Sequence, residues 1–226
     1  MHFLFSDTPT SYANVRIIFC DTEKSNWSYD SIRKQYFWHR FYSHQPDLNY
    51  DNPKVQEEMM NVARFWLKLG IDGFRADAVP YLYEREGFCF LSYHLHFLQL
   101  GTSCENLPET HQFFRRVRRM METEFPGTVL LSEANMLAKD AVQYFGRGDE
   151  FQMSFNFPVM PRLCVPPSLL CLCTFLSFSS VSLLFDNQRF MCLKTETRDK
   201  LVQVLQDTPD IPPACQWFVF AAPSCL

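Results

Sequence analysis

The chain has 226 residues, of which 47% are hydrophobic and 16% aromatic, and its formal net charge is −4. This slightly acidic balance has no basic footprint, so we expect no nucleic-acid partner. The odd total of nine cysteines argues against a disulfide framework. The first residues, MHFLF, lack a basic start and a long apolar core, so the sequence supports no signal peptide, and a cytoplasmic location is the default expectation.

A helix is predicted from Asn52 to Gly70. Asn52 suits the cap, Pro53 suits the first helical position, and Gly70 suits a left-handed turn at the end. Apolar residues recur at steps of three and four, which predicts one buried face made of Val55, Met59, Val62, Trp66 and Leu69.

A strand is predicted at Ile71–Asp77, within the stretch GIDGFRADAVP. Side chains two residues apart share a strand face, so Arg75 and Asp77 lie on the same side. A permanent cation beside a carboxylate lowers the pKa of the acid and keeps it ionised. The pair fits a nucleophilic or stabilising carboxylate and equally fits a structural salt bridge at a strand end.

The helix-then-strand unit recurs twice. The stretch LPETHQFFRRVRRMMETEFPG predicts a helix that stops at Pro126-Gly127, followed by a strand that ends in Glu133. A short helix around Lys139–Phe145 then precedes a turn at 146–149 and a strand at Phe151–Phe157. This alternation predicts an α/β fold with parallel strands, either a barrel or an open sheet. Polar residues at the C-terminal strand ends line the site in both architectures, which draws attention to Asp77 and Glu133.

Two carboxylates on different strands, one beside an arginine and the other without an obvious cation, fit the division of labour in glycoside hydrolysis. The first, Asp77, acts as nucleophile. The second, Glu133, has its pKa raised by burial and acts as proton donor and then as base.

Several motifs resemble one enzyme family. GFRADAVP and LLSEAN resemble the second and third signature segments of the alpha-amylase family, glycoside hydrolase family 13. QPDLN at Gln45–Asn49 resembles the segment that marks its oligo-1,6-glucosidase branch. Longer stretches resemble the branch that interconverts maltose and trehalose, over most of residues 5–87, 102–163 and 190–217. The resemblance implies a (β/α)8 TIM barrel.

The resemblance also implies roles for single residues. It makes Asp77 the nucleophile, Glu133 the general acid/base, and Arg75 the residue that orients the nucleophile and contacts sugar, while Gln45 contacts substrate. It further implies a calcium site, and mixed carboxylate and carbonyl oxygens suit such a hard cation. The matching oxygens are the side chains of Asp47 and Glu84 and the backbone carbonyls of Tyr81 and Leu82. No organic cofactor is implied.

The implied substrate is maltose, trehalose or another alpha-glucoside, with retention at the anomeric carbon. Two alternatives stay open: a hydrolase of the alpha-glucosidase or alpha-amylase type, and a non-catalytic sugar-binding fragment. No membrane partner is expected.

The resemblance predicts one incomplete catalytic domain, a partial barrel truncated at both ends. Residues 1–50 would be the remnant of an inserted B subdomain, 51–217 the central barrel units, and 218–226 an aberrant tail. The first signature, with an aspartate and an asparagine–histidine pair, and the fourth, a histidine–aspartate pair, have no match in the sequence. We therefore expect this chain to be inactive by itself.

Two inserts interrupt the resemblance, at 88–101 and 164–189. The run from Cys164 to Phe185 is long enough to span a bilayer, but its five serines and two prolines make a transmembrane helix a poor fit. A buried core segment would need a periodicity that is absent. Phe, Leu, Ser, Pro or Cys occupy 19 of these 22 positions, a bias expected if the pyrimidine tract of an intron were translated. The hypothesis that both inserts are retained introns predicts that mature message lacks them.

Overall fold

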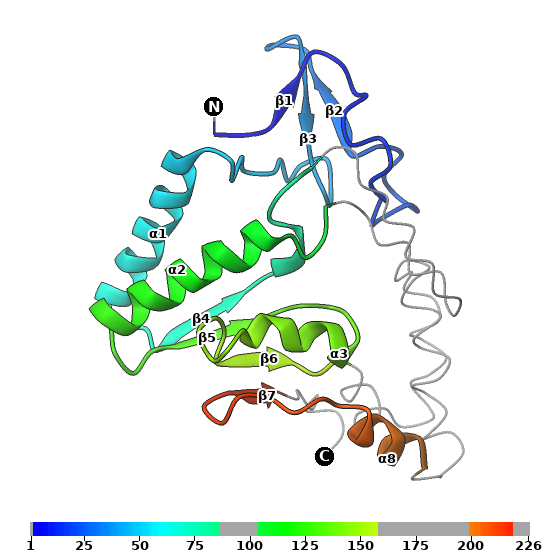
Figure 1. Cartoon of the computed structure of the whole chain (residues 1–226). Coiled ribbons are helices and arrows are strands. Elements are labelled where there is room, and N and C mark those ends of the chain that lie inside the picture. Colours follow the sequence, from blue (N-terminus) through cyan, green and yellow to red (C-terminus); the bar gives the residue numbers. More distant parts are fainter. Residues whose placement is uncertain (1, 86–103, 158–198, 219–226) are drawn as a thin grey trace, which may run out of the picture. The chain divides into compact units, whose positions relative to one another are not determined.

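The computed structural model describes residues 2–85, 104–157 and 199–218. Both inserts predicted at 88–101 and 164–189 lie outside the described residues. The chain divides into two compact units, one formed by 1–69 with 80–113 and the other by 70–79 with 114–226. Figure 1 shows the elements of each unit along the chain.

The first unit contains a three-stranded antiparallel sheet with the strand order β1-β3-β2. Its strands are β1 (Phe5–Ser6), β2 (Trp27–Asp30) and β3 (Gln35–Trp38). The register pairs Trp27 with Trp38, so both indoles lie on one face. They meet edge to face at 5.1 Å and are buried with Val15 and Cys104, which makes this face of the sheet the core of the unit.

Helix α1 (Pro53–Lys68) forms where the sequence predicts it. The side chain of Asn52 accepts a hydrogen bond from the Lys54 backbone N–H at 3.0 Å, and Gly70 takes the left-handed conformation with φ of 94°. The predicted buried face is confirmed at Val55, and Met59 is half-buried, but the prediction is wrong at the other three positions, because Val62, Trp66 and Leu69 are 41%, 48% and 63% exposed. The buried residues are Val55, Met60 and Leu67. Apolar residues make up half of this helix and lie on more than one of its faces, so periodicity alone leaves its orientation open.

The second unit is built on a four-stranded parallel sheet in the order β4-β5-β6-β7. The strands are β4 (Gly73–Ala76), β5 (Val129–Ser132), β6 (Met153–Phe155) and β7 (Gln216–Phe218). The intervening segments hold η1 (Val79–Tyr81), α2 (Pro108–Glu124), α3 (Ala138–Ala141), η2 (Val142–Phe145) and α8 (Asp199–Gln206). Parallel neighbours in chain order, joined by helical crossovers, confirm the predicted α/β alternation.

The strand β7, like the three strands of the first unit, is an element that sequence reasoning missed. Phe218 pairs in register with Phe155 of β6, so it belongs to the sheet and not to the tail that was predicted to begin there. Residues 219–226 lie outside the described residues. The rings of Phe155 and Phe218 meet edge to face at 5.2 Å, which adds packing to the strand pairing.

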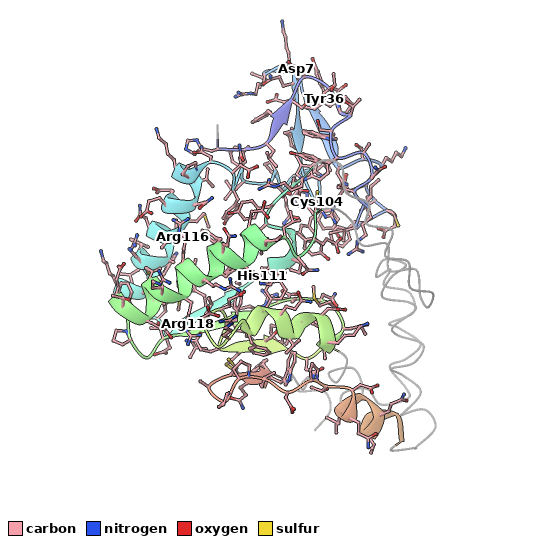
Figure 2. The ribbon with its side chains drawn as sticks, viewed as in Figure 1. Asp7, Tyr36, Cys104, His111, Arg116 and Arg118 are labelled. Atoms are coloured by element: carbon pink, nitrogen blue, oxygen red, sulfur yellow. The ribbon has the colours of Figure 1, made fainter. Side chains whose placement is uncertain are left out.

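Two local features hold the sheet of the second unit in place. A Cβ on Gly73 would lie 2.0 Å from the Val129 carbonyl oxygen, so only glycine lets β4 approach β5. Arg118 lies on α2 (Figure 2). Its guanidinium pairs with Glu122 and donates to the buried Glu150 carbonyl oxygen at 3.1 Å. Gly73 faces the first residue of β5, and the Arg118 contact lies just before the start of β6.

Candidate active site

Asp77 and Glu133 lie at the same level of the sheet, each directly after its strand. The register pairs Ala76 of β4 with Ser132 of β5, and the two acids are the next residues. The Glu133 backbone N–H donates to the Ala76 carbonyl at 3.0 Å, and the Val79 N–H donates to the Glu133 carbonyl at 3.2 Å. The main chain thus fixes the position of Glu133 beside the end of β4.

One arginine nitrogen contacts both acids. Nη2 of Arg75 lies 3.2 Å from Oδ1 of Asp77 and also donates to Oε2 of Glu133. Two oxygens on one donor are no more than about 6 Å apart at ordinary hydrogen-bond lengths. The expectation that Glu133 lacks a cationic neighbour is therefore wrong. The sequence does not reveal this contact, because Arg75 lies on β4 whereas Glu133 follows the adjacent strand β5.

The three side chains differ in their exposure to solvent. Those of Arg75 and Asp77 are 49% and 73% exposed, while that of Glu133 is 23% exposed. The stretch that reads as a buried strand in the sequence thus ends in an open polar edge. A substrate in solution can reach these groups.

The pKa of Glu133 is raised to about 7, and its causes have opposite signs. Loss of water by burial is the largest cause, followed by a hydrogen bond with Asp77 that favours the neutral acid. Arg75 lowers the pKa, but it does not offset burial and the negative charge of Asp77. The predicted rise by burial is confirmed. A carboxyl that titrates near neutrality is suited to donate and accept a proton.

Gln45 lies in the first unit, whereas Arg75, Asp77 and Glu133 lie in the second. Gln45 is exposed, and its backbone N–H closes a turn by donating to the Tyr42 carbonyl at 2.8 Å.

The predicted metal ligands Asp47 and Glu84 lie close together in the first unit, beside Trp38. The Trp38 indole N–H donates to Oε1 of Glu84 at 2.9 Å, and it also stabilises the charged form of Asp47. The Arg40 backbone N–H donates to Oδ2 of Asp47 at 3.0 Å. The other oxygen of Glu84, Oε2, is buried and has no hydrogen-bond partner among the described residues. Such an orphaned carboxylate oxygen suits a cation.

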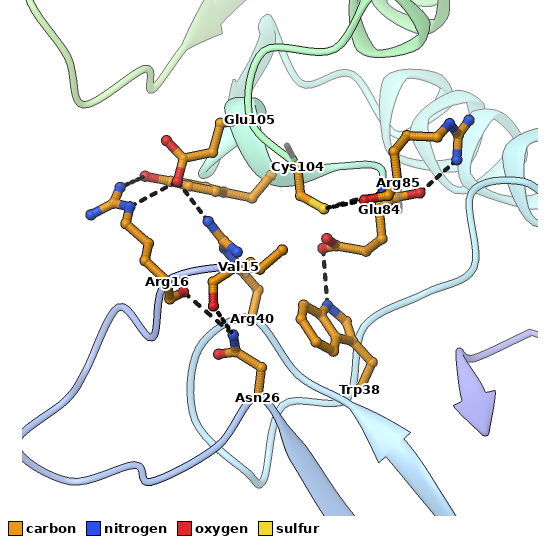
Figure 3. A network of polar contacts seen from close by, with 10 residues as sticks. Val15, Arg16, Asn26, Trp38, Arg40, Glu84, Arg85, Cys104 and Glu105 are labelled. Carbon is orange, nitrogen blue, oxygen red and sulfur yellow. Dashed lines mark hydrogen bonds and ion pairs between the residues drawn. The ribbon is translucent and has the colours of Figure 1, made fainter. Parts of the chain in front are cut away.

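The pKa values of both acids support the same conclusion. The pKa of each acid is raised to about 7, and burial is the largest cause for both. For Asp47 the negative charge of Glu84 is the second cause. A hydrogen bond from the Cys104 thiol lowers the pKa of Glu84 but does not offset burial. Nearby, Arg16 and Arg40 both pair with Glu105 (Figure 3). The two guanidinium groups thus lie near three carboxyls, those of Asp47, Glu84 and Glu105. A cation or bound protons must balance the one negative charge that is left over.

The two strand-end acids lie within a known catalytic domain. The alpha-amylase catalytic domain matches residues 6–166 of the chain.

The chain belongs to the alpha-amylase family.

Members of the family with curated names cover most of the chain. The trehalose synthase/amylase TreS of Mycobacterium tuberculosis is 48% identical over 223 residues, which are 97% of this chain and 30% of that protein. The alpha-glucosidase of Apis mellifera is 37% identical over 145 residues, which are 59% of this chain and 25% of that protein. The chain thus spans less than a third of the length of these relatives.

A solved structure that is similar to this chain supports the fold. The isomaltulose synthase PalI of Klebsiella sp. LX3 superposes with a TM-score of 0.56 and 28% identity, over 72% of this chain and 29% of that chain. The parallel sheet of the second unit is accordingly part of a (β/α)8 barrel.

Sequence reasoning missed a structural arginine of this family member. Arg85 holds Asp51 with two nitrogens, each at 2.9 Å, and Glu109 with Nε at 2.9 Å. Its backbone N–H contacts the Cys104 sulfur at 3.2 Å. The arginine therefore links three places in the chain: Asp51 just before α1, Glu109 in the first turn of α2, and Cys104, which follows residues 86–103. Its position between Glu84 and Glu86 was the only signal in the sequence.

No helix among the described residues combines the length and the apolar character that crossing a membrane requires. The transmembrane alternative considered for Cys164–Phe185 falls on residues outside that description.

Proposed function

We propose that Asp77 and Glu133 are the nucleophile and the general acid/base of a retaining enzyme that acts on alpha-glucosides. One observation carries this proposal: both carboxyls lie on Nη2 of Arg75 at the ends of adjacent strands, and the pKa of Glu133 is about 7. Retaining glycosidases need two carboxyls about 5–5.5 Å apart, one ionised and one protonated. A pair held by one nitrogen fits that spacing.

The chemistry follows from these positions. Asp77 attacks the anomeric carbon while Glu133 gives its proton to the glycosidic oxygen, so the bond to the leaving sugar breaks and a glucosyl ester forms on Asp77. Glu133, now ionised, takes a proton from the acceptor hydroxyl. The acceptor oxygen attacks the same anomeric carbon and releases Asp77. Two inversions give net retention.

The proposed reaction is the isomerisation of maltose to trehalose. Here the freed glucose turns and attacks through its anomeric oxygen, giving the alpha,alpha-1,1 linkage. The name and 48% identity of TreS support this choice. Because the chain spans 30% of TreS, the test uses both residues 1–226 and a chain extended to the length of the relatives. Trehalose as the product from maltose supports isomerisation.

A hydrolase is the second candidate, supported by the 37% identical alpha-glucosidase of Apis mellifera. Water replaces glucose as the acceptor, so glucose alone accumulates from maltose. Binding of maltose with neither product would favour a non-catalytic fragment. A cytoplasmic location stays a prediction.

A trapping experiment tests the nucleophile directly. In a chain extended to the length of the relatives, a 5-fluoro-alpha-glucosyl fluoride reacts with a retaining nucleophile, and its fluorine slows release, so the protein gains the mass of one fluoroglucosyl group. The label should map to Asp77 and disappear in Asp77→Ala. Asp72→Asn, which removes an exposed acid at the other end of β4, is the matched control and should label normally. Labelling of another acid, with Asp77 unmodified, would refute the assignment.

We also propose that Asp47 and Glu84 hold a calcium ion, together with the carbonyl oxygens of Tyr81 and Leu82. The orphaned Oε2 of Glu84 and the raised pKa of both acids support this choice. Oxygen ligands of mixed charge suit Ca²⁺. When bound, the ion would supply the positive charge that this buried cluster lacks and would stabilise the first unit without taking part in the reaction.

A further inference from the structure

Three rings of the first unit form a stack that ends at the protein surface. Phe19 and Tyr42 are nearly parallel, with ring centroids 4.3 Å apart and planes inclined by 13°. Tyr42 and His44 continue the stack at 5.3 Å and 11°. Phe19 and Tyr42 are partly buried, whereas His44 is exposed. This aromatic ladder of Phe19, Tyr42 and His44 thus ends in a ring that solvent can reach.

The base of the aromatic ladder is held firmly. Phe19 contacts Phe41 at 5.9 Å, and Phe41 meets the Tyr81 ring edge to face at 5.5 Å. The turn that carries the other two rings is fixed by a hydrogen bond from the Ser43 backbone N–H to Oε1 of Glu23 at 2.9 Å. His44 is therefore exposed but pre-oriented, which lowers the entropic cost of binding against it.

The next residue supplies the polar half of a binding site. Gln45 is also exposed, and its amide carries two donors and an acceptor. A hexopyranose has one face of C–H groups and a rim of hydroxyls, so it matches a flat ring with an amide beside it. A purely apolar partner would leave the amide without a hydrogen bond. The combination therefore favours a sugar over an apolar ligand.

We infer that His44 is a sugar-stacking residue that, with Gln45, binds one glucose unit of an alpha-glucoside such as maltose. The inference rests on the proposed function for the class of ligand, an alpha-glucoside, and extends it by assigning a binding residue within the first unit. His44 acts by binding and takes no part in proton transfer. The side chains of Tyr42 and Phe19 support its ring from beneath.

Maltose binding to the 226-residue chain tests this inference, by calorimetric titration and by saturation transfer to the sugar protons. His44→Ala removes the ring and should weaken maltose binding roughly five- to tenfold. His44→Phe keeps a flat ring and should bind within about twofold of the wild type. Tyr29→Ala removes a ring that is 55% exposed but lies outside the aromatic ladder, and it should leave binding unchanged.

The inference is overturned if His44→Ala binds maltose as tightly as the wild type, if His44→Phe is as weak as His44→Ala, or if the wild type does not bind maltose. Labelling of Asp77 separates this result from the proposed reaction. If Asp77 labels while His44→Ala binds normally, only the stacking role fails. If His44→Ala weakens binding while Asp77 never labels, the reaction fails and the stacking role stands.

Discussion

Arg75 of β4 donates to Glu133 at the end of β5 through the same nitrogen that contacts Asp77. The arginine thus stands between the two acids instead of serving only one. Asp77 raises the pKa of Glu133, and Arg75 lowers it. The pKa of Glu133 therefore depends on both neighbours. Replacing Arg75 and replacing Asp77 should shift this pKa in opposite directions.

Replacing Arg75 by Leu should raise the pKa of Glu133 above about 7, because the stabilising cation is lost. Asp77→Asn should lower it, because the negative neighbour is removed. The pKa is measured by NMR titration of carboxyl-labelled glutamate, with the Glu133 signal assigned from Glu133→Gln. Equal values in all three proteins would show that burial alone sets the pKa.

Glu133 should also make the stability of the second unit depend on pH. Its pKa is raised from 4.5 in the unfolded chain to about 7 in the folded protein, so the folded state binds the proton more tightly. This contribution is fully present below about 4.5 and is lost as pH rises through about 7. Urea unfolding of the wild type and Glu133→Gln should show the wild type losing stability relative to the variant across that window. A parallel pH dependence in both proteins would contradict the prediction, and Asp72→Asn serves as the control.

Calcium should stabilise the first unit if Asp47 and Glu84 bind it. At pH 8, where both acids are ionised, saturating Ca²⁺ should raise the melting temperature by roughly 5 °C. The rise should shrink at pH 5.5, because calcium must then displace protons. Glu84→Gln should abolish the effect, whereas Glu58→Gln on the exposed face of α1 should retain it. An equal rise in the Glu84→Gln protein would place the ion elsewhere.

Gly73→Ala should be strongly destabilising, because a Cβ there would meet the Val129 carbonyl oxygen at 2.0 Å. We expect a loss of about 3 kcal/mol in the free energy of unfolding as the two strands separate. Gly127→Ala is the control. Gly127 has a φ of 89°, and no atom of the described residues lies within 4 Å of the position that a Cβ would take, so alanine there should cost only about 1 kcal/mol of backbone strain. Similar losses from both substitutions would mean that β4 can move away from β5.

Residues 86–103 should be removable without loss of the first unit. The residues on either side are in contact, since the Arg85 backbone N–H lies 3.2 Å from the Cys104 sulfur. Two glycines can bridge such a gap, because each trans peptide advances the chain by about 3.8 Å. Near-UV circular dichroism of the buried pair Trp27 and Trp38 should keep its wild-type shape. The control replaces the segment by glycine and serine at equal length. If the deletion loses this signal while the control keeps it, the short link strains the fold and the prediction is wrong.

The sequence by itself determined where most helices and strands between residues 52 and 157 begin and end, because caps, glycines and apolar periods act over a few residues. Asn52 and Gly70 delimit α1, and Asp77 and Glu133 fall at the ends of parallel strands as predicted. The motifs around these acids also determined the family.

Only the tertiary structure decided which neighbours these residues meet. The contact of Arg75 with Glu133 joins positions 58 residues apart, and the Trp38 bond to Glu84 joins positions 46 apart. Likewise, the buried side of α1 and the inclusion of Phe218 in β7 depend on distant partners. Local propensity carries no information about such pairs, because strand register and burial are set by surfaces that meet only after the chain has folded.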